Sequence, residues 1–86
     1  MPPVPVEALD KEELRHTIAK AMYMEVADIG DEQRFIEDLE VDSLMALEVA
    51  VVLEKRYGVR LRPAELQQIT CLNTVYDLMR AKLGAL

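Results

Sequence analysis

The sequence DSLMALEVAVVLEKRYG at residues 42–58 contains a helix together with its start and stop signals. Asp42 is a preferred N-cap residue, because a carboxylate at that position accepts a backbone N–H group of the first turn. Gly58 predicts the end of the helix, since glycine adopts the left-handed backbone of a C-terminal stop without steric cost. We therefore predict a helix that begins at Ser43 and ends at Tyr57.

The apolar residues of this helix fall on two faces. The first is predicted to face the core and comprises Ala46, Val49, Ala50, Leu53 and Tyr57. The second comprises Leu44, Leu47 and Val51. Three interpretations of the second face and the small residues are open. In the first, the helix packs between other helices on two sides. In the second, Leu44, Leu47 and Val51 dock partner proteins, with Glu48 and Glu54 adding charge. In the third, Ala46 and Ala50 leave internal space for an apolar guest.

An amphipathic helix is predicted before this one, over residues 11–25. Asp10 and Glu13 have the spacing of a capping box, and Leu9 and Leu14 have the spacing of a hydrophobic staple. The apolar stripe of this helix is predicted to comprise Leu14, Ile18, Ala21 and Met22.

A long connection and two more helices complete the expected fold. Residues 26–41 are too many to be structureless in so small a domain, so apolar anchors are expected there. The predicted anchors are Ile29, Phe35, Ile36 and Leu39. Pro63 opens a short helix over residues 64–68, and the last helix begins at Thr70 or Cys71 with an apolar stripe of Leu72, Val75, Tyr76 and Met79. The fold class is all-α, a small bundle of three main helices plus one short helix.

Length and charge restrict the organisation and the partners. Eighty-six residues make one domain, with residues 1–10 as a flexible tail or linker, because prolines occupy positions 2, 3 and 5, and with residues 11–86 as the folded part. Met1 is either a natural start or the first residue of an excised domain. The net charge of −6 disfavours nucleic acid and anionic membranes and favours partners with basic patches. No apolar run is long enough to span a membrane, so a cytoplasmic monomer is expected.

The reactive side chains are few. The single cysteine, Cys71, excludes an internal disulfide and a structural zinc site, so no metal is expected. We interpret Cys71 as a small apolar residue. The single histidine, His16, lies off the apolar stripe of its helix, so a Ser-His-Asp triad at Ser43 has no support. A small hydrolase is therefore the weakest function class.

Ser43 occupies a helix N-terminus, where backbone N–H groups and the helix dipole favour a phosphate. The negative charge of Asp42 disfavours a phosphate at this position. By itself, the tripeptide Asp-Ser-Leu indicates only an ordinary helix start.

The surrounding sequence carries a stronger signal. The run FIEDLEVDSLMALEVAVVLEKRYGVRL, followed by LRPAELQQITCLNTVYDLM, resembles the acyl carrier proteins of polyketide and fatty-acid synthesis. The resemblance extends over about residues 11–83. Its features, in order, are Phe35-x-x-Asp38-Leu39, Asp42-Ser43-Leu44, Glu48, the Gly58 stop and Ile69-Thr70.

This resemblance implies a carrier and not an enzyme. Ser43, flanked by Asp42 and Leu44, would receive 4′-phosphopantetheine from coenzyme A through a phosphopantetheinyl transferase, and the thiol of the arm would hold acyl groups as thioesters. The implied partners are a ketosynthase, an acyltransferase and other synthase enzymes or domains. They would dock on Leu44, Leu47, Glu48, Val51 and Glu54.

Three departures from the family bear on the pathway. Glu40 replaces a common glycine, so the backbone there is less free. Met45 replaces an acidic residue usual in fatty-acid carriers, and Lys55 and Arg56 interrupt an acidic stretch. The sequence therefore favours a polyketide carrier. The alternatives are a fatty-acid carrier or an unmodified helical interaction module, and the cargo and its sequestration in the bundle are left open.

Overall fold

The computed structural model describes residues 5–84, and this range contains helices and no strand. The α-helices are α1 (Lys11–Ala21), α2 (Ser43–Tyr57), α3 (Pro63–Leu66) and α4 (Leu72–Gly84). Two single turns of 3-10 helix, η1 (Val6–Ala8) and η2 (Val26–Asp28), precede and follow α1. The prediction of an all-α bundle with three main helices and one short one is confirmed.

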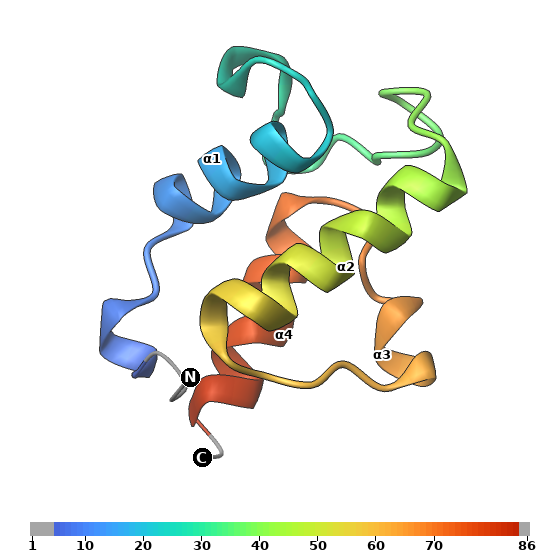
Figure 1. Cartoon of the computed structure of the whole chain (residues 1–86). Helices are drawn as coiled ribbons and strands as arrows, with labels where there is room; N and C mark the ends of the chain where they lie inside the picture. Colours follow the sequence, from blue (N-terminus) through green and yellow to red (C-terminus); the bar gives the residue numbers. More distant parts are fainter. Residues whose placement is uncertain (1–4, 85–86) are drawn as a thin grey trace.

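The core lies where α1, α2 and α4 meet. In Figure 1, α1 lies above α2, and α4 lies behind α2; α1 contacts both of the other helices. Four of the five residues predicted for the inner face of α2 are buried, namely Val49, Ala50, Leu53 and Tyr57. Ala46 is only half-buried. On α4 the buried residues are Leu72, Val75, Leu78, Met79 and Leu83, while Tyr76 is half-buried against the core.

The ends of α2 are those predicted from the sequence. The Oδ1 atom of Asp42 accepts a hydrogen bond from the backbone N–H of Leu44 at 2.8 Å. At the other end, Gly58 has a φ of 68° and donates its N–H to the carbonyl of Glu54 at 3.0 Å. The two signals thus fix the first and last residues of the helix that contains Ser43.

The first helix is shorter than predicted, ending at Ala21 instead of residue 25. Tyr23 has a φ of 56°, and the N–H of Met24 donates to the carbonyl of Ala19 at 2.9 Å. Together with the bond from Tyr23 N to Lys20 O at 3.3 Å, this is a Schellman stop. This stop was not predictable from the sequence, because tyrosine stands at the position that glycine usually occupies.

The start of α1 also differs from the prediction. Asp10 is the N-cap residue, but its side chain accepts no hydrogen bond from the helix, so the predicted capping box is wrong. Its partner in that box, Glu13, instead forms an ion pair with Arg56 of α2 at 3.6 Å. Leu9 and Leu14 are both buried in the same core, as the predicted staple requires.

The predicted tail is structured from residue 5 onward. Pro2 and Pro3 lie outside the described residues. Val6–Ala8 forms η1, which contacts α4, and Leu9 is buried in the core. Apolar burial therefore holds residues 6–9 against the bundle. The boundary at residues 10 and 11 stays a prediction.

The connection from α1 to α2 is fastened to the rest of the fold at Phe35. Its side chain is fully buried, and its N–H donates to the carbonyl of Thr70 at 2.8 Å. Ile29 is buried and Leu39 half-buried, as predicted. Ile36 is 51% exposed, so its prediction as an anchor is wrong. Phe35 fills the inward position of this turn, and its neighbour is left on the outer side.

The short helix α3 and the start of α4 lie within a few residues of the predictions. α3 covers Pro63–Leu66 instead of residues 64–68. The N–H of its N-cap residue, Arg62, donates to Glu65 Oε1 at 2.8 Å. α4 begins at Leu72, later than predicted, because Thr74 Oγ1 accepts the N–H of Cys71 at 3.1 Å and so acts as a cap from inside the helix. Cys71 is buried.

A second fastening joins the connection to α1 through Arg15. Its guanidinium donates to the carbonyl of Ile29 and to the carboxylates of Glu12 and Asp31. The hydrogen bonds that Glu12 accepts from Arg15 hold the pKa of Glu12 below its ordinary value. The pKa of Asp31 is also lowered, first by the hydrogen bond from Arg15 and then by the bond from Lys11.

Replacing Arg15 by methionine is expected to destabilise the protein at neutral pH and to reduce its acid sensitivity. Both carboxyl pKa values lie below the ordinary 4.5 and 3.8 in the folded state. Their stabilisation is therefore present above these values and is lost as the pH falls through the folded-state values. Urea unfolding at pH 7 and pH 3 measures the free energy of unfolding. The difference in this free energy between wild type and Arg15→Met should be smaller at pH 3 than at pH 7. Arg34→Met, which removes an exposed ion pair with Glu37, is the control and should change little.

Glu40 occupies left-handed backbone, with a φ of 56°. A non-glycine residue there has an unfavourable contact between its Cβ and the backbone. Glu40→Gly removes that contact from the folded state. Glycine also raises the conformational entropy of the unfolded chain, which offsets part of the gain, so the variant is expected to be more stable by about 0.5 kcal/mol. Urea unfolding of Glu40→Gly and of the control Glu40→Ala measures the difference. If the alanine variant gains as much as the glycine variant, the effect comes from the lost charge and not from the backbone.

Candidate functional site

Ser43 is the first residue of α2 and is exposed. It is also the only serine in the chain. The first turn of α2 has no acidic residue, and its backbone N–H groups and dipole favour an anion at this end. Asp42 already accepts the N–H of Leu44, so its carboxylate competes for one of these donors. The Ser43 hydroxyl therefore lies at a helix start that tolerates a phosphate and is open to another molecule.

No general base accompanies the Ser43 hydroxyl in residues 5–84. The side-chain hydrogen bonds of this range do not include Ser43. His16 lines a hollow together with Arg56, near the far end of α2. At about 1.5 Å per residue, Arg56 lies about 20 Å along the helix from Ser43. Within residues 5–84, the hydroxyl therefore has no hydrogen-bonded side chain that would activate it as a nucleophile.

A surface hollow of about 250 Å³ adjoins Ser43. It lies between α2, α3 and the turn at Phe35, and its lining is mostly apolar. The lining residues are Ile36, Ser43, Ala46, Leu47, Leu66, Gln67, Ile69 and Thr70. Its volume is just below the usual range of about 300–1,000 Å³ for small-molecule pockets. Sequence reasoning missed this hollow, since its residues come from three segments far apart in the chain.

The two alanines of α2 differ in their surroundings. Ala46 lines the hollow, whereas Ala50 is 3% exposed and lies in the packed core. Only one of them therefore leaves space, and that space is open at the surface.

The second apolar face of α2 is uncovered. Leu44 is 65% exposed, Leu47 is 48% exposed and Val51 is 43% exposed. Glu48 is exposed beside them. The interpretation that this face packs against another helix of the chain is wrong, because α1 and α4 cover the opposite side. Glu54 is half-buried and accepts the N–H of Leu61 at 2.7 Å, so its carboxylate holds the connection after α2.

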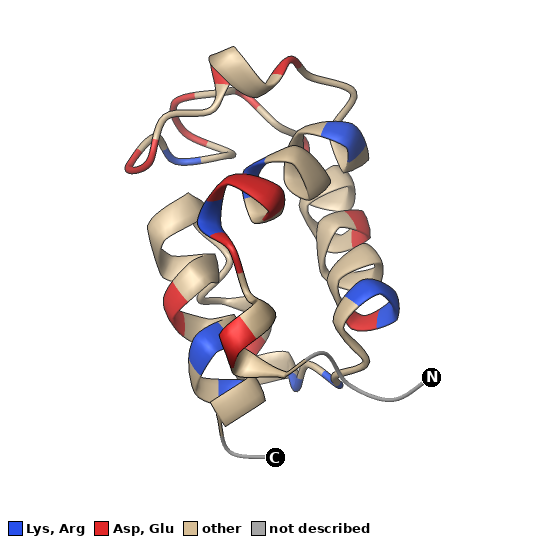
Figure 2. Cartoon of the chain, turned by 90° about the vertical axis from the view of Figure 1, so that its left-hand side faces the viewer, with Lys and Arg blue, Asp and Glu red and all other residues tan. Residues whose placement is uncertain are grey.

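Charge divides the molecule along α2. Residues 25–42, which lead to Ser43, contain eight acidic residues and one basic residue, Arg34. Figure 2 shows this connection at the top with Asp and Glu in red. The last turn of α2, the connection at residues 58–62 and the end of α4 carry Lys and Arg at the bottom. A partner with basic residues is therefore drawn to the end of the molecule that holds Ser43.

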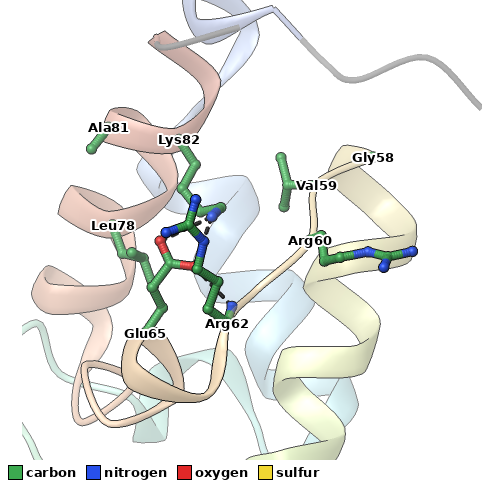
Figure 3. A pocket seen from close by; sticks show the side chains of 8 residues that line it. All are labelled: Gly58, Val59, Arg60, Arg62, Glu65, Leu78, Ala81 and Lys82. Carbon is green, nitrogen blue, oxygen red and sulfur yellow. Dashed lines mark hydrogen bonds and ion pairs between the residues drawn. The ribbon is translucent and has the colours of Figure 1, made fainter.

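A larger hollow, of about 590 Å³, lies at the other end of α2 (Figure 3). Lys82 of α4 donates to both carboxylate oxygens of Glu65 across its floor, at 2.7 and 2.9 Å. This bond, with a smaller contribution from the N–H of Arg62, lowers the pKa of Glu65. Arg60 points away from the pair in Figure 3. The hollow thus contains a clamp between α3 and α4, and Gly58 on its lining is about 22 Å from Ser43 along α2.

Two further kinds of site are absent from the described part of the chain. No group of three or more His, Cys, Asp or Glu residues is arranged to hold a metal ion within residues 5–84. None of the helices in this range combines the length and apolarity needed to cross a membrane.

Comparison with known proteins identifies similar chains. A family model described as a phosphopantetheine attachment site matches residues 12–79, which include Ser43 and all of α2 and α3. The chain is 54% identical to "Polyketide-8 synthase acyl carrier protein 2" of Streptomyces avermitilis over 84 residues, covering 98% of this chain and 97% of that protein. It is 32% identical to "Acyl carrier protein" of Acidothermus cellulolyticus over 74 residues, covering 81% of this chain and 88% of that protein.

Proposed function

This chain belongs to the acyl carrier proteins, which bear a phosphopantetheine attachment site, and from that premise we propose that Ser43 is its attachment residue. The observation that carries the proposal is an exposed hydroxyl on the first residue of a long helix, inside the matched segment. No other serine competes for the role. The protein is a carrier and not an enzyme.

The surroundings of Ser43 fit the group. The N-terminal end of α2 favours the phosphate, and the hollow beside Ser43 has apolar walls that suit a slim chain. When bound, the group supplies a terminal thiol that holds acyl groups as thioesters. Ser43 anchors the group by its hydroxyl oxygen, while Asp42 fixes the start of α2 and so the position of that oxygen. Leu44, the other flanking residue, lies on the exposed face where an approaching enzyme would contact it.

The pathway that we infer for this carrier is polyketide biosynthesis. The relative of 54% identity is named as a polyketide synthase carrier, and the match covers nearly the full length of both chains. The relative of 32% identity has a name that specifies no pathway. The partners would be a phosphopantetheinyl transferase, which transfers the group from coenzyme A, and then a ketosynthase, an acyltransferase and other synthase enzymes.

These enzymes would recognise the exposed face of α2. The proposed docking face consists of Leu44, Leu47, Glu48 and Val51, next to the attachment residue. Contiguous exposed apolar residues flanked by charge are typical of protein interaction sites. We leave out Glu54, because its carboxylate already accepts the N–H of Leu61.

Replacing Ser43 by alanine is expected to abolish attachment of phosphopantetheine. Incubation with coenzyme A and a broad-specificity transferase, followed by intact mass spectrometry, measures the attachment. Thr70→Ala is the matched control, since Thr70 lines the same hollow with a hydroxyl group. The control should be modified as wild type is. A mass increase in Ser43→Ala, or none in wild type, would contradict the proposal and leave the unmodified interaction module as the better reading.

Changes on the docking face are expected to slow attachment and acyl loading without unfolding the protein. Leu47→Asp places a charge on the apolar patch, and Glu48→Arg reverses the charge beside it. Both residues are exposed, so the free energy of unfolding should change by less than about 1 kcal/mol. Initial rates of modification and circular dichroism measure the two effects.

The contrasting variant is Leu53→Asp, on the buried face of the same helix, which should unfold the protein. Unchanged rates in Leu47→Asp and Glu48→Arg would refute the docking face. Loss of helicity in Leu47→Asp would instead assign that residue to the core.

A further inference from the structure

A groove of about 550 Å³ runs between α1 and α2, away from the docking face. Three residues of α1 and three of α2 line it, namely Thr17, Lys20, Ala21, Val52, Lys55 and Arg56. Lys55 and Arg56 are the basic residues in the last turn of α2. The carrier function described above leaves them without a role.

The cations at this groove are available to another molecule. Lys20 and Lys55 are exposed, and neither forms an ion pair with a residue in the range 5–84. Arg56 pairs with Glu13 at 3.6 Å, but its side chain is 50% exposed. Glu13 is the one acidic side chain of the adjoining hollows on this side. The groove therefore has an excess of positive charge on a chain whose net charge is −6.

The floor of the groove is apolar. Ala21 and Val52 are half-buried, so part of each side chain remains open to contact. Thr17 is also half-buried, and its hydroxyl donates to the carbonyl of Glu13 at 2.9 Å, which leaves its methyl group as the free part of the side chain. An apolar floor between cationic rims matches a helix that has small apolar residues on one face and carboxylates along its edges.

Helix-end electrostatics explain part of this pattern. Lys20 lies in the last turn of α1, and Lys55 and Arg56 lie in the last turn of α2, where cations stabilise the helix dipole. This dipole stabilisation acts on each helix separately, so it does not require the cations of α1 and those of α2 to lie near one another. Here the cations of two helices converge on one groove with an apolar floor, and the convergence is what a ligand would recognise.

The groove is remote from the attachment residue. Lys55 lies about 18 Å along α2 from Ser43, at about 1.5 Å per residue. A molecule in the groove thus leaves Ser43 and the start of α2 uncovered.

We propose that the groove between α1 and α2 is a second docking surface, which binds an acidic amphipathic helix of a partner protein. Charge complementarity selects this occupant over a basic one, which Lys20, Lys55 and Arg56 would repel. Because the two surfaces are separate, a partner held here keeps the carrier tethered while Ser43 is presented to another enzyme.

The test uses a synthetic helical peptide with Glu along its edges and Ala and Leu on one face. Titration into ¹⁵N-labelled protein at low and high salt gives the affinity and the residues that respond. The expected result is saturable binding that weakens with salt, with the largest shift changes at the six lining residues. A peptide with Lys in place of Glu should not bind.

A charge-reversal pair separates the groove from general charge effects. Lys20→Glu/Lys55→Glu is expected to lower the affinity for the acidic peptide about tenfold or more. The matched control, Arg60→Glu/Arg80→Glu, changes the net charge equally at exposed residues outside the groove and should alter the affinity less than about threefold.

Other outcomes overturn the proposal. They are no saturable binding, equal loss in both double variants, or shift changes centred on Leu44, Leu47 and Val51. Self-association of the chain through the groove, or binding of anionic vesicles in preference to the peptide, would also refute it by assigning a different occupant. These readouts do not depend on modification of Ser43, so the proposal can fail while the carrier function stands, and the reverse also holds.

Discussion

The hydrogen bond from the N–H of Phe35 to the carbonyl of Thr70, together with burial of the Phe35 ring, fixes the long connection to the bundle. This bond and the buried ring offset part of the conformational freedom that the chain between α1 and α2 loses on folding. The bond joins a residue before α2 to the turn before α4. It thereby brings the start of α2 next to Ile69 and Thr70, and the hollow beside Ser43 exists because these segments meet.

The second helix serves stability and recognition with different faces. Val49, Ala50, Leu53 and Tyr57 contribute to the core, whereas Leu44, Leu47 and Val51 remain in water. Exposed apolar side chains contribute little to folding, and three of them on one helix are the basis for the proposed docking face. Ser43 at the N-terminal end of the same helix has its position fixed by the cap and not by the face, so the proposed attachment residue and the proposed docking face depend on different residues.

Charge adds direction to this arrangement. The acidic connection at residues 25–42 surrounds the start of α2, and the cations gather near its end, in the groove with α1 and around the clamp of Glu65 and Lys82 (Figure 2). A partner with basic residues is drawn to one end of the molecule, and one with acidic residues to the other. The two ends of one helix can thus be recognised by different proteins.

The sequence alone determined α2 and the all-α class, because Asp42 and Gly58 act within a few residues of themselves. The proposal for Ser43 also came from the sequence, through the resemblance on both sides of it. The exposed face of α2 was also predictable, since α2 contains more apolar residues than one buried stripe can hold, and helical periodicity places the remainder on a second face. Tertiary structure decided what depends on distant partners. The exposure of Ile36 and the ion pair of Glu13 with Arg56 follow from how segments meet. The hollow beside Ser43 and the groove between α1 and α2 likewise require residues that only packing brings together, and no local pattern encodes such a meeting.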